Sequence, residues 1–378
     1  MFSNTVCHLV GDILTPGGFT RGQLDINAQH IAAITGESIT DGEAGANGRA
    51  IILPGFIDLH VHGGGGHDVM QGGDAASMMA RLHARHGTTS LLATTMTAPL
   101  ADLEHACNGI GKAMRLPAGS GARILGVHLE GPFISPEKLG AQPDFHRPLD
   151  VAEILNLHDR AAIRLITLAP ELVGVSSVLP QLIAAGFCVQ LGHTAASYET
   201  CVEAMALGAQ GFTHLFNAMS GLHHRAPGAV GAALAHADYA EIIPDLLHVH
   251  AGAIRTALRA IPGLYCVTDG TSATGMPDGD YLLGRQSVHK CLGGVRLADG
   301  TLAGSTLTMD QALRNLVSLG LSLSESSRRT STIAAKHIGL YDRGELSVGN
   351  IADMAILDAQ LKICRVITEG AEIDLKDA

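Results

Sequence analysis

The sequence of 378 residues lacks tryptophan and has few charged residues, 16% in all. Acidic residues outnumber basic ones by 36 to 25, which gives a formal net charge of -11 at pH 7. Nucleic acids and anionic membranes are bound through dense fields of Lys and Arg, so this composition argues against both partners. An anionic ligand would have to be held by a few local groups.

The chain also lacks C-x-x-C pairs, a basic and then apolar leader segment, and any run of about 18 apolar residues. Its seven cysteines are odd in number and scattered from Cys7 to Cys364, which is typical of a reduced protein without a disulfide framework. We therefore expect a soluble cytoplasmic protein that binds no membrane. Its hydrophobic content of 46% is sufficient for a large buried core.

The chain is rich in glycine and histidine, with 46 and 20 residues. Between residues 51 and 270, short apolar runs alternate with Ala- and Leu-rich helical stretches, a pattern typical of βαβ units with parallel strands. Eight such runs favour a (β/α)8 barrel over an open doubly wound sheet. The predicted strands are 51–60, 88–95, 123–129, 163–168, 187–192, 211–214, 242–249 and 264–269.

The two ends of the chain differ from this pattern. Residues 1–50 and 344–378 contain short strand-like runs separated by tight turns. We predict that the two ends pair into one small β domain, a β-sandwich, beside a barrel formed by residues 51–343.

Side chains suited to metal binding end five of the eight predicted strands. In a (β/α)8 barrel the catalytic residues come from the carboxyl ends of the strands, so these side chains are expected to meet at one face. His60 and His62 lie two residues apart, which puts both imidazoles on the same side of a strand. The strand-end residues are His60, His62, His128, Glu130, His193, His214 and Asp269.

One carboxylate and two imidazoles with an open position form the usual catalytic zinc arrangement, which Glu130, His193 and His214 fit. His60 and His62 could hold a second ion, and Asp269 could act as general base and acid. Each residue alone has an ordinary explanation, such as a hydrogen-bonded structural histidine or, for Asp269, a turn or helix cap. Their joint occurrence at one barrel face favours a metal-dependent hydrolase.

Residues 54–63, Pro-Gly-Phe-Ile-Asp-Leu-His-Val-His-Gly, resemble the first-strand signature of the amidohydrolase superfamily. Residues 128–133, His-Leu-Glu-Gly-Pro-Phe, are similar to the signature of the N-acetylglucosamine-6-phosphate deacetylases. Motifs at 192–194, 213–219, 247–249, 267–270 and 302–305 continue the resemblance in order over nearly the whole chain. It implies a zinc-type divalent ion, one or two per subunit, and hydrolysis of an N-acetylated amino-sugar phosphate to acetate and the free amine.

The resemblance also implies roles for single residues. Glu130, His193 and His214 would hold the principal ion, and Asp269 would be the acid/base residue. Arg225 and His248 would bind phosphate and reach into the neighbouring subunit's site, which implies a homodimer; an arginine fork suits phosphate oxygens. The remaining residues implied in substrate binding are Ala141, Gln142, Asn217, Ala218, Leu302 and Ser305.

The chain departs from the family pattern at two positions. Gln142 stands where the family usually has a histidine that helps to polarise the acetyl carbonyl, and glutamine can offer only a neutral N–H donor. We hypothesise that a second ion at His60 and His62 takes over part of this polarisation. Leu246 stands where the family tends to have glycine.

Other functions are consistent with parts of the sequence. A related hydrolase could act on another N-acyl amino sugar, such as the galactosamine epimer, and a catalytically silent sensor could use the same pocket. A sensor would be expected to have lost Asp269 or a ligand. A cyclic-amide hydrolase would place a bridging lysine at a strand end, and none is found there. The stretch His62-Gly-Gly-Gly could form a serine-hydrolase oxyanion hole, but the G-x-S-x-G motif is absent.

Overall fold

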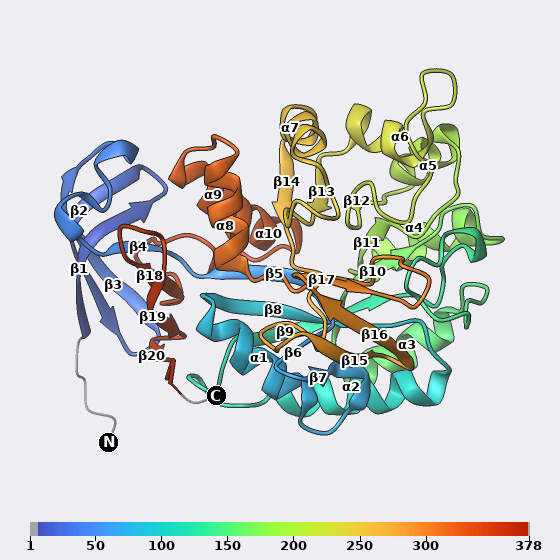
Figure 1. Ribbon diagram of the computed structural model, residues 1–378, viewed down its shortest axis with the longest axis horizontal. Helices are drawn as coiled ribbons and strands as arrows, with labels where there is room; N and C mark the ends of the chain where they lie inside the picture. Colours follow the sequence, from blue (N-terminus) through green and yellow to red (C-terminus); the bar gives the residue numbers. More distant parts are fainter. Residues whose placement is uncertain (1–6, 377–378) are drawn as a thin grey trace.

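Eight parallel strands form the central ring of the computed structural model, which describes residues 7–376 (Figure 1). They are β5 (Phe56–Val61), β8 (Thr88–Thr95), β9 (Arg123–Glu130), β10 (Ile163–Leu168), β11 (Cys188–Leu191), β12 (Gly211–Phe212), β13 (Tyr239–Ile242) and β14 (Gly263–Cys266). Six are hydrogen-bonded in the order β12–β11–β10–β9–β8–β5, and β13 pairs with β14. Val61 bridges to Gly270 after β14, and the Leu215 N–H donates to the Glu241 carbonyl at 2.9 Å, so both gaps are closed. The predicted (β/α)8 barrel is confirmed.

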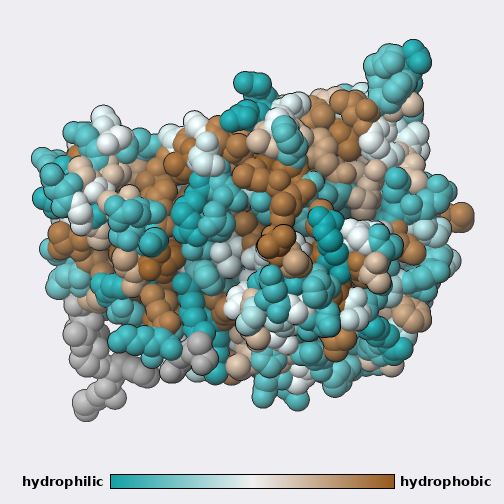
Figure 2. Space-filling view, viewed as in Figure 1, coloured by the Kyte–Doolittle hydropathy of each residue, from teal (hydrophilic) through white to brown (hydrophobic). Residues whose placement is uncertain are grey.

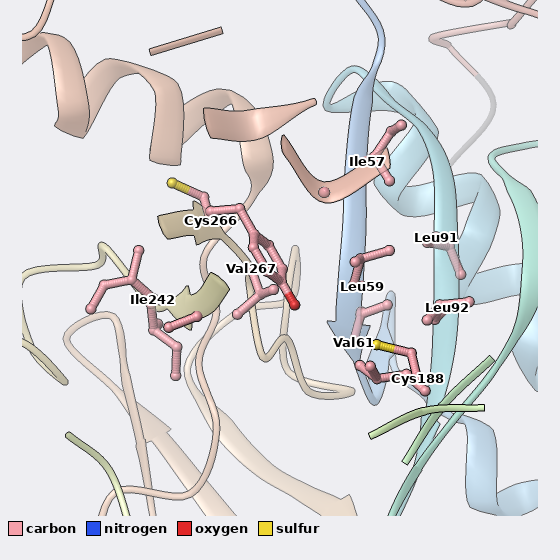
Figure 3. Close-up of a cluster of buried hydrophobic side chains, with 14 of the residues drawn as sticks. Ile57, Leu59, Val61, Leu91, Leu92, Cys188, Ile242, Cys266 and Val267 are labelled. Atoms are coloured by element: carbon pink, nitrogen blue, oxygen red, sulfur yellow. The ribbon is translucent and has the colours of Figure 1, made fainter. Parts of the chain in front are cut away.

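A helix follows each barrel strand and packs outside the ring. The helices are α1 (Ala75–Arg85), α2 (Leu100–Ala113), α3 (Val151–Arg160), α4 (Val175–Ala184), α5 (Tyr198–Ala206), α6 (Gly228–His236), α7 (Ala251–Ala260) and α8 (Met309–Ser318), after which α9 (Leu323–Thr330) and α10 (Thr332–His337) complete the layer. Figure 3 shows Ile57, Leu59 and Val61 of β5 among the apolar side chains of this core. Because side chains alternate along a strand, the residues between them face the barrel interior.

The two chain ends form one seven-stranded sheet, in the order β20–β19–β18–β4–β1–β2–β3. Its strands are β1 (Cys7–Thr15), β2 (Gly18–Asn27), β3 (His30–Ser38), β4 (Ile51–Pro54), β18 (Met354–Leu357), β19 (Ile363–Thr368) and β20 (Ala371–Glu372). Leu24 of β2 and Ile356 of β18 belong to the same buried cluster, so the sheet folds over a core of its own. The predicted small β domain is present, hydrogen-bonded as one continuous sheet.

The sequence predicts one barrel strand over residues 51–60, but the structure divides this run at Gly55. Residues 51–54 form β4, which pairs with β1 and β18 in the end domain, and the barrel strand β5 begins at Phe56. A Cβ atom at Gly55 would lie 2.2 Å from the side chain of Thr89, so the chain passes very close to β8 at this point. The break was not visible because both halves are largely apolar.

The seventh predicted strand, 242–249, is also placed wrongly. The strand β13 ends at Ile242, and Pro244, which has no N–H to donate, follows closely. Residues 243–249 form a loop instead, in which Leu246 and Leu247 are 41% and 52% exposed.

A three-stranded antiparallel sheet, absent from the sequence prediction, is inserted between β14 and α8. It consists of β15 (Gly279–Leu283), β16 (Gln286–Cys291) and β17 (Gly294–Arg296). Leu283 and Val288 pack with Met96, which follows β8, in a small separate core. Figure 1 shows the inserted sheet beside the carboxyl ends of the barrel strands, where it adds a wall to the site described below.

Arg343 connects the barrel to the end domain. Its guanidinium is buried and donates to the Ser90 hydroxyl of β8 at 2.8 Å and to the Asp353 carboxylate at 3.2 Å. A second carboxylate, Glu369, lies 3.7 Å away. Asp353 therefore depends on Arg343 for its countercharge, whereas Glu369 is also paired with Arg123.

We expect Arg343→Met to lower the free energy of unfolding by about 3–5 kcal/mol, because it leaves Asp353 buried without a countercharge. Denaturant titration measures this change. Lys336→Met is the matched control: its ion pair with Glu345 is half exposed, so about 0–1 kcal/mol is expected. Equal losses in the two variants would show that Arg343 contributes no more than a surface ion pair.

Candidate metal centre and active site

His60 of β5 and His62, which directly follows the strand, point into the barrel, with their Nε2 atoms 3.2 Å apart. The Nδ1–H of His62 donates to the Thr94 carbonyl at 3.1 Å, and that of His60 donates to the Glu241 carboxylate at 2.9 Å. An acceptor behind each ring fixes the proton on Nδ1, so the Nε2 lone pairs face inward. This is the arrangement that a metal-binding imidazole needs.

Glu130, His193 and His214 form a second group at the ends of β9, β11 and β12. The Nε2 atoms of the two histidines lie 3.1 Å apart, at 3.1 and 3.0 Å from one Glu130 oxygen. Ligands placed about 2.0–2.1 Å from a tetrahedral ion lie about 3.3 Å from one another, so these separations match an ion site. His193 also donates through Nδ1 to the Lys138 carbonyl at 2.8 Å.

Two carboxylates connect these groups. The other oxygen of Glu130 lies 3.2 Å from His62 Nε2, and an oxygen of Asp269 lies 3.3 Å from His62 and 3.5 Å from His60. Glu130 is 1% and Asp269 8% exposed. Such ligand atoms, buried and within reach of one another, can hold one or two divalent ions.

The electrostatics of the centre favour a cation. Burial raises the pKa of Glu130, but His60, His193 and His214 more than offset this and hold it well below its usual range. Burial likewise opposes the low pKa of Asp269, which His60 and His62 bring to about 2. For His62, burial lowers the pKa, whereas Asp269 and Glu130 raise it to about 9. The two carboxylates thus hold their negative charge and attract any available positive charge, which a divalent ion can supply.

Three of these side chains are presented by strained backbone. His193, His214 and Asp269 have φ angles of +47°, +28° and +50°, in the left-handed region that non-glycine residues rarely adopt. Such residues cluster at functional sites, where the surrounding structure holds them in place. The Asp269 N–H donates to the His60 carbonyl at 2.8 Å, and its carbonyl accepts from the Ser305 N–H at 2.7 Å.

A cavity of about 230 Å³ opens onto the centre. Of the residues that the sequence implies in substrate binding, Ala141, Gln142, Asn217, Ala218, His248 and Leu302 line it, together with His62, Glu130, His193, His214 and Asp269. The barrel therefore brings both groups of predicted residues to one cavity.

Two predicted substrate residues, Ser305 and Arg225, do not line the cavity. Ser305 is buried behind Asp269, where its hydroxyl donates to the Thr268 carbonyl at 2.5 Å. Arg225 is exposed on the loop before α6 and contacts the ring of His224. His248, which was expected to reach into a neighbouring subunit's site, lies in the cavity of its own chain instead, because the loop after β13 turns it there.

Comparison with known proteins decides the family. The amidohydrolase family model matches residues 51–374. The chain belongs to the amidohydrolase family. It is 39% identical to the N-acetylglucosamine-6-phosphate deacetylase of Lysinibacillus sphaericus, with 84% of each chain covered, and 38% identical to the N-acetylgalactosamine-6-phosphate deacetylase of Escherichia coli O157:H7, with 85% and 87% covered. A Mycobacterium smegmatis deacetylase variant in complex with N-acetyl-D-glucosamine 6-phosphate superposes with a TM-score of 0.89 at 33% identity, covering 98% and 100% of the chains.

Gln142 holds a fixed position in this amidohydrolase. Its Nε2 donates to Glu130 at 2.6 Å, and its Oε1 accepts the Thr97 N–H at 2.7 Å. Both ends of the amide are engaged, so its orientation is determined by its partners. Gln142 thus supports a candidate ligand directly.

Several residues of the site were missed in the sequence analysis. Met96, Leu283 and Thr301 line the cavity, and the last two come from the inserted sheet or the segment that follows it. Glu241 lies within β13 and bonds His60. The only signal for Glu241 is an acidic residue inside an apolar strand, which periodicity alone does not single out.

Among residues 7–376, no helix of this amidohydrolase has the length and apolar character that a membrane crossing requires. On the face shown in Figure 2, hydrophilic and hydrophobic side chains are interspersed, with a hydrophobic group near α6 and α7 at the upper edge.

Proposed function

We propose that this amidohydrolase cleaves the acetamide of N-acetyl-D-glucosamine 6-phosphate, giving D-glucosamine 6-phosphate and acetate. The observation that carries the proposal is the meeting of a carboxylate–imidazole centre, an ionised Asp269 and His248 at one cavity. Relatives named for this deacetylation, matched over most of the chain, support the choice of substrate.

Glu130, His193 and His214 would hold the principal ion, for which we propose zinc, and His60 and His62 would hold a second. When bound there, a divalent ion supplies Lewis acidity, which activates water for attack on an acyl carbonyl. Asp269 accepts a proton from the attacking water and returns it to the amine nitrogen as the C–N bond breaks. Its low pKa keeps it ionised, as a base must be at neutral pH.

At the other end of the substrate, we propose that His248 binds the phosphate. Its Nδ1–H donates to Asp245 at 2.7 Å, which leaves Nε2 free for the ligand. Ala141, Gln142, Asn217, Ala218 and Leu302 line the cavity between this point and the metal centre and would contact the sugar. Ser305 would act through Asp269 instead, since its N–H donates to the Asp269 carbonyl.

The galactosamine epimer is a second candidate substrate. The E. coli O157:H7 relative named for it is 38% identical, against 39% for the L. sphaericus glucosamine relative, so overall identity does not separate the two sugars. Acetate release from both phosphorylated epimers, with unphosphorylated N-acetylglucosamine alongside, distinguishes them. Absence of release from all three would contradict the proposed function.

Asp269→Asn should lower kcat by about 10²–10⁴-fold, because the amide cannot take up the proton from water. The ion held by Glu130, His193 and His214 should stay bound, since Asp269 is not a member of that group. Steady-state acetate release and elemental analysis of the same sample measure both quantities. Full turnover by this variant would remove Asp269 from the chemical step.

The charge on His248 predicts a pH dependence. Burial lowers its pKa, but the hydrogen bond and charge of Asp245 raise it, Asp269 adds to this, and Arg296 opposes it; the net shift is upward. A histidine with a raised pKa is charged below that pKa and loses its charge as the pH rises through it. KM for the phosphorylated sugar should therefore increase as the pH rises through this raised pKa.

Asp245→Asn should lower the pKa of His248 and move this rise in KM to lower pH. The unphosphorylated sugar is the control, because its KM does not depend on a phosphate contact. An identical KM profile in wild type and variant would separate His248 from phosphate binding.

We also propose a homodimer in which Arg225 supplies a phosphate contact to the partner's site. Arg225 lies outside its own cavity, and within residues 7–376 its guanidinium forms no ion pair. Leu222 on the same loop is 60% exposed, and Figure 2 shows hydrophobic side chains near α6 and α7.

Light scattering should give twice the mass of 39.2 kDa, and Arg225→Ala should raise KM without changing that mass. A monomer would contradict the shared site.

The seven cysteines are all free, as is usual in a reducing compartment, which supports the cytoplasmic location that we propose.

A further inference from the structure

Glu241 is a fully buried acidic residue that the proposed chemistry does not use. Its side chain takes part in three hydrogen bonds and accepts in each. One oxygen receives the Nδ1–H of His60 at 2.9 Å and the backbone N–H of His214 at 3.1 Å, and the other receives the Tyr265 hydroxyl at 3.3 Å. An environment made only of donors is the environment of an ionised carboxylate.

Glu241 is not itself placed to be a metal ligand. It lies near His60 and His128, a grouping that by distance alone could hold an ion. Both ring nitrogens of His128 are already engaged, however: Nδ1–H donates to the Leu59 carbonyl at 3.0 Å, and Nε2 accepts the Thr167 hydroxyl at 2.7 Å. The Nε2 lone pair of His128 is already engaged by a hydroxyl, so this group is a hydrogen-bonded network.

One oxygen of Glu241 instead contacts a member of each candidate ligand group. Towards His60, a carboxylate behind the ring fixes the proton on Nδ1 and raises the basicity of Nε2, the atom that faces the centre. Towards His214, the same oxygen holds the N–H of a residue whose φ is +28°. The backbone carbonyl of Glu241 also accepts the Leu215 N–H at 2.9 Å.

The position of the Glu241 side chain is itself fixed by a hydrogen bond from Tyr265, which is in turn bonded to Gln190. The Tyr265 hydroxyl that donates to it accepts the Gln190 Nε2–H at 2.6 Å, and Gln190 also contacts His337 at 2.9 Å. Tyr265, Gln190 and Glu241 are all fully buried. Because the Glu241 carboxylate is already held in place, it can orient the His60 ring, and neither side chain loses much conformational freedom when a metal binds.

We propose that Glu241 is a positioning residue that couples the two ion sites, fixing the His60 ring for the second ion while anchoring the backbone of His214 for the first. The proposal rests on the two-ion form of the proposed function. It predicts that the affinity for the second ion depends on the charge of a residue that touches neither ion nor substrate.

The test is Glu241→Gln, which preserves shape and can retain an oxygen facing His60 and His214 but removes the charge. We expect the affinity for the second ion to fall about 10–100-fold, while the first ion stays bound. Zinc titration of the metal-free protein against a chromophoric chelator, with elemental analysis, gives both affinities independently of activity. Circular dichroism checks that the variant is folded.

Tyr265→Phe is the matched control. It removes the hydroxyl at the other oxygen of Glu241 but leaves the bonds to His60 and His214, so second-ion affinity should be nearly that of the wild type. An equal loss in both variants would assign the effect to general disturbance of the buried network and overturn the proposal. Unchanged binding of both ions by Glu241→Gln would do the same.

A measurement on the wild-type protein tests the proposal even if the variant does not fold. Nuclear magnetic resonance of ¹⁵N-histidine in the zinc-loaded protein should show His60 with its proton on Nδ1 and zinc on Nε2. Zinc on Nδ1 would overturn the proposal. Acetate release by an enzyme with one ion per chain would also overturn the proposal, but it would leave the deacetylase function intact. Two bound ions without acetate release would contradict the proposed function alone.

Discussion

The carboxylates of Glu130 and Asp269 lie buried among imidazoles at the mouth of the barrel, and much of the surrounding structure serves to keep them charged there. Ionised carboxylates lose hydration on burial and need compensating charge and donors. Four imidazoles supply these contacts, and each of His60, His62 and His193 is held from behind by its own acceptor. The same arrangement that makes the buried charge tolerable makes it a site for cations.

The need to give buried polar groups hydrogen-bond partners extends further into the barrel interior. The interior of such barrels is usually filled by bulky aliphatic layers. Here a hydrogen-bonded chain through Thr167, Thr213 and Gln190 connects His128 with Tyr265. Since the polar atoms along this chain bond to one another, the interior can be polar and rigid together. Apolar side chains of the barrel strands, such as Leu59 and Val61, belong to the buried cluster that Figure 3 shows.

The sequence predicted the parts of the molecule that depend on local pattern. Alternation in β5 put His60 and His62 on one face, and the strand-end rule brought Glu130 and Asp269 to the same mouth. Contacts between residues that are far apart in the chain could not be predicted from local pattern. The role of Glu241 depends on its hydrogen bond to His60, which is distant in the sequence. The inserted sheet follows β14 without a periodic signal. The boundary at Gly55 was hidden because the apolar character of β4 continues into β5.

The strand β4 lies between β1 and β18, with Met354 of β18 paired to Pro54, and it leads directly into the barrel strand that carries His60. During synthesis, β1 to β4 leave the ribosome before the barrel elements, whereas β18 follows the barrel elements. One edge of β4 must therefore wait for a partner while almost the whole barrel is synthesised. Unpaired strand edges invite association with other chains, so the pairing of β18 with β4 is the step that removes this hazard.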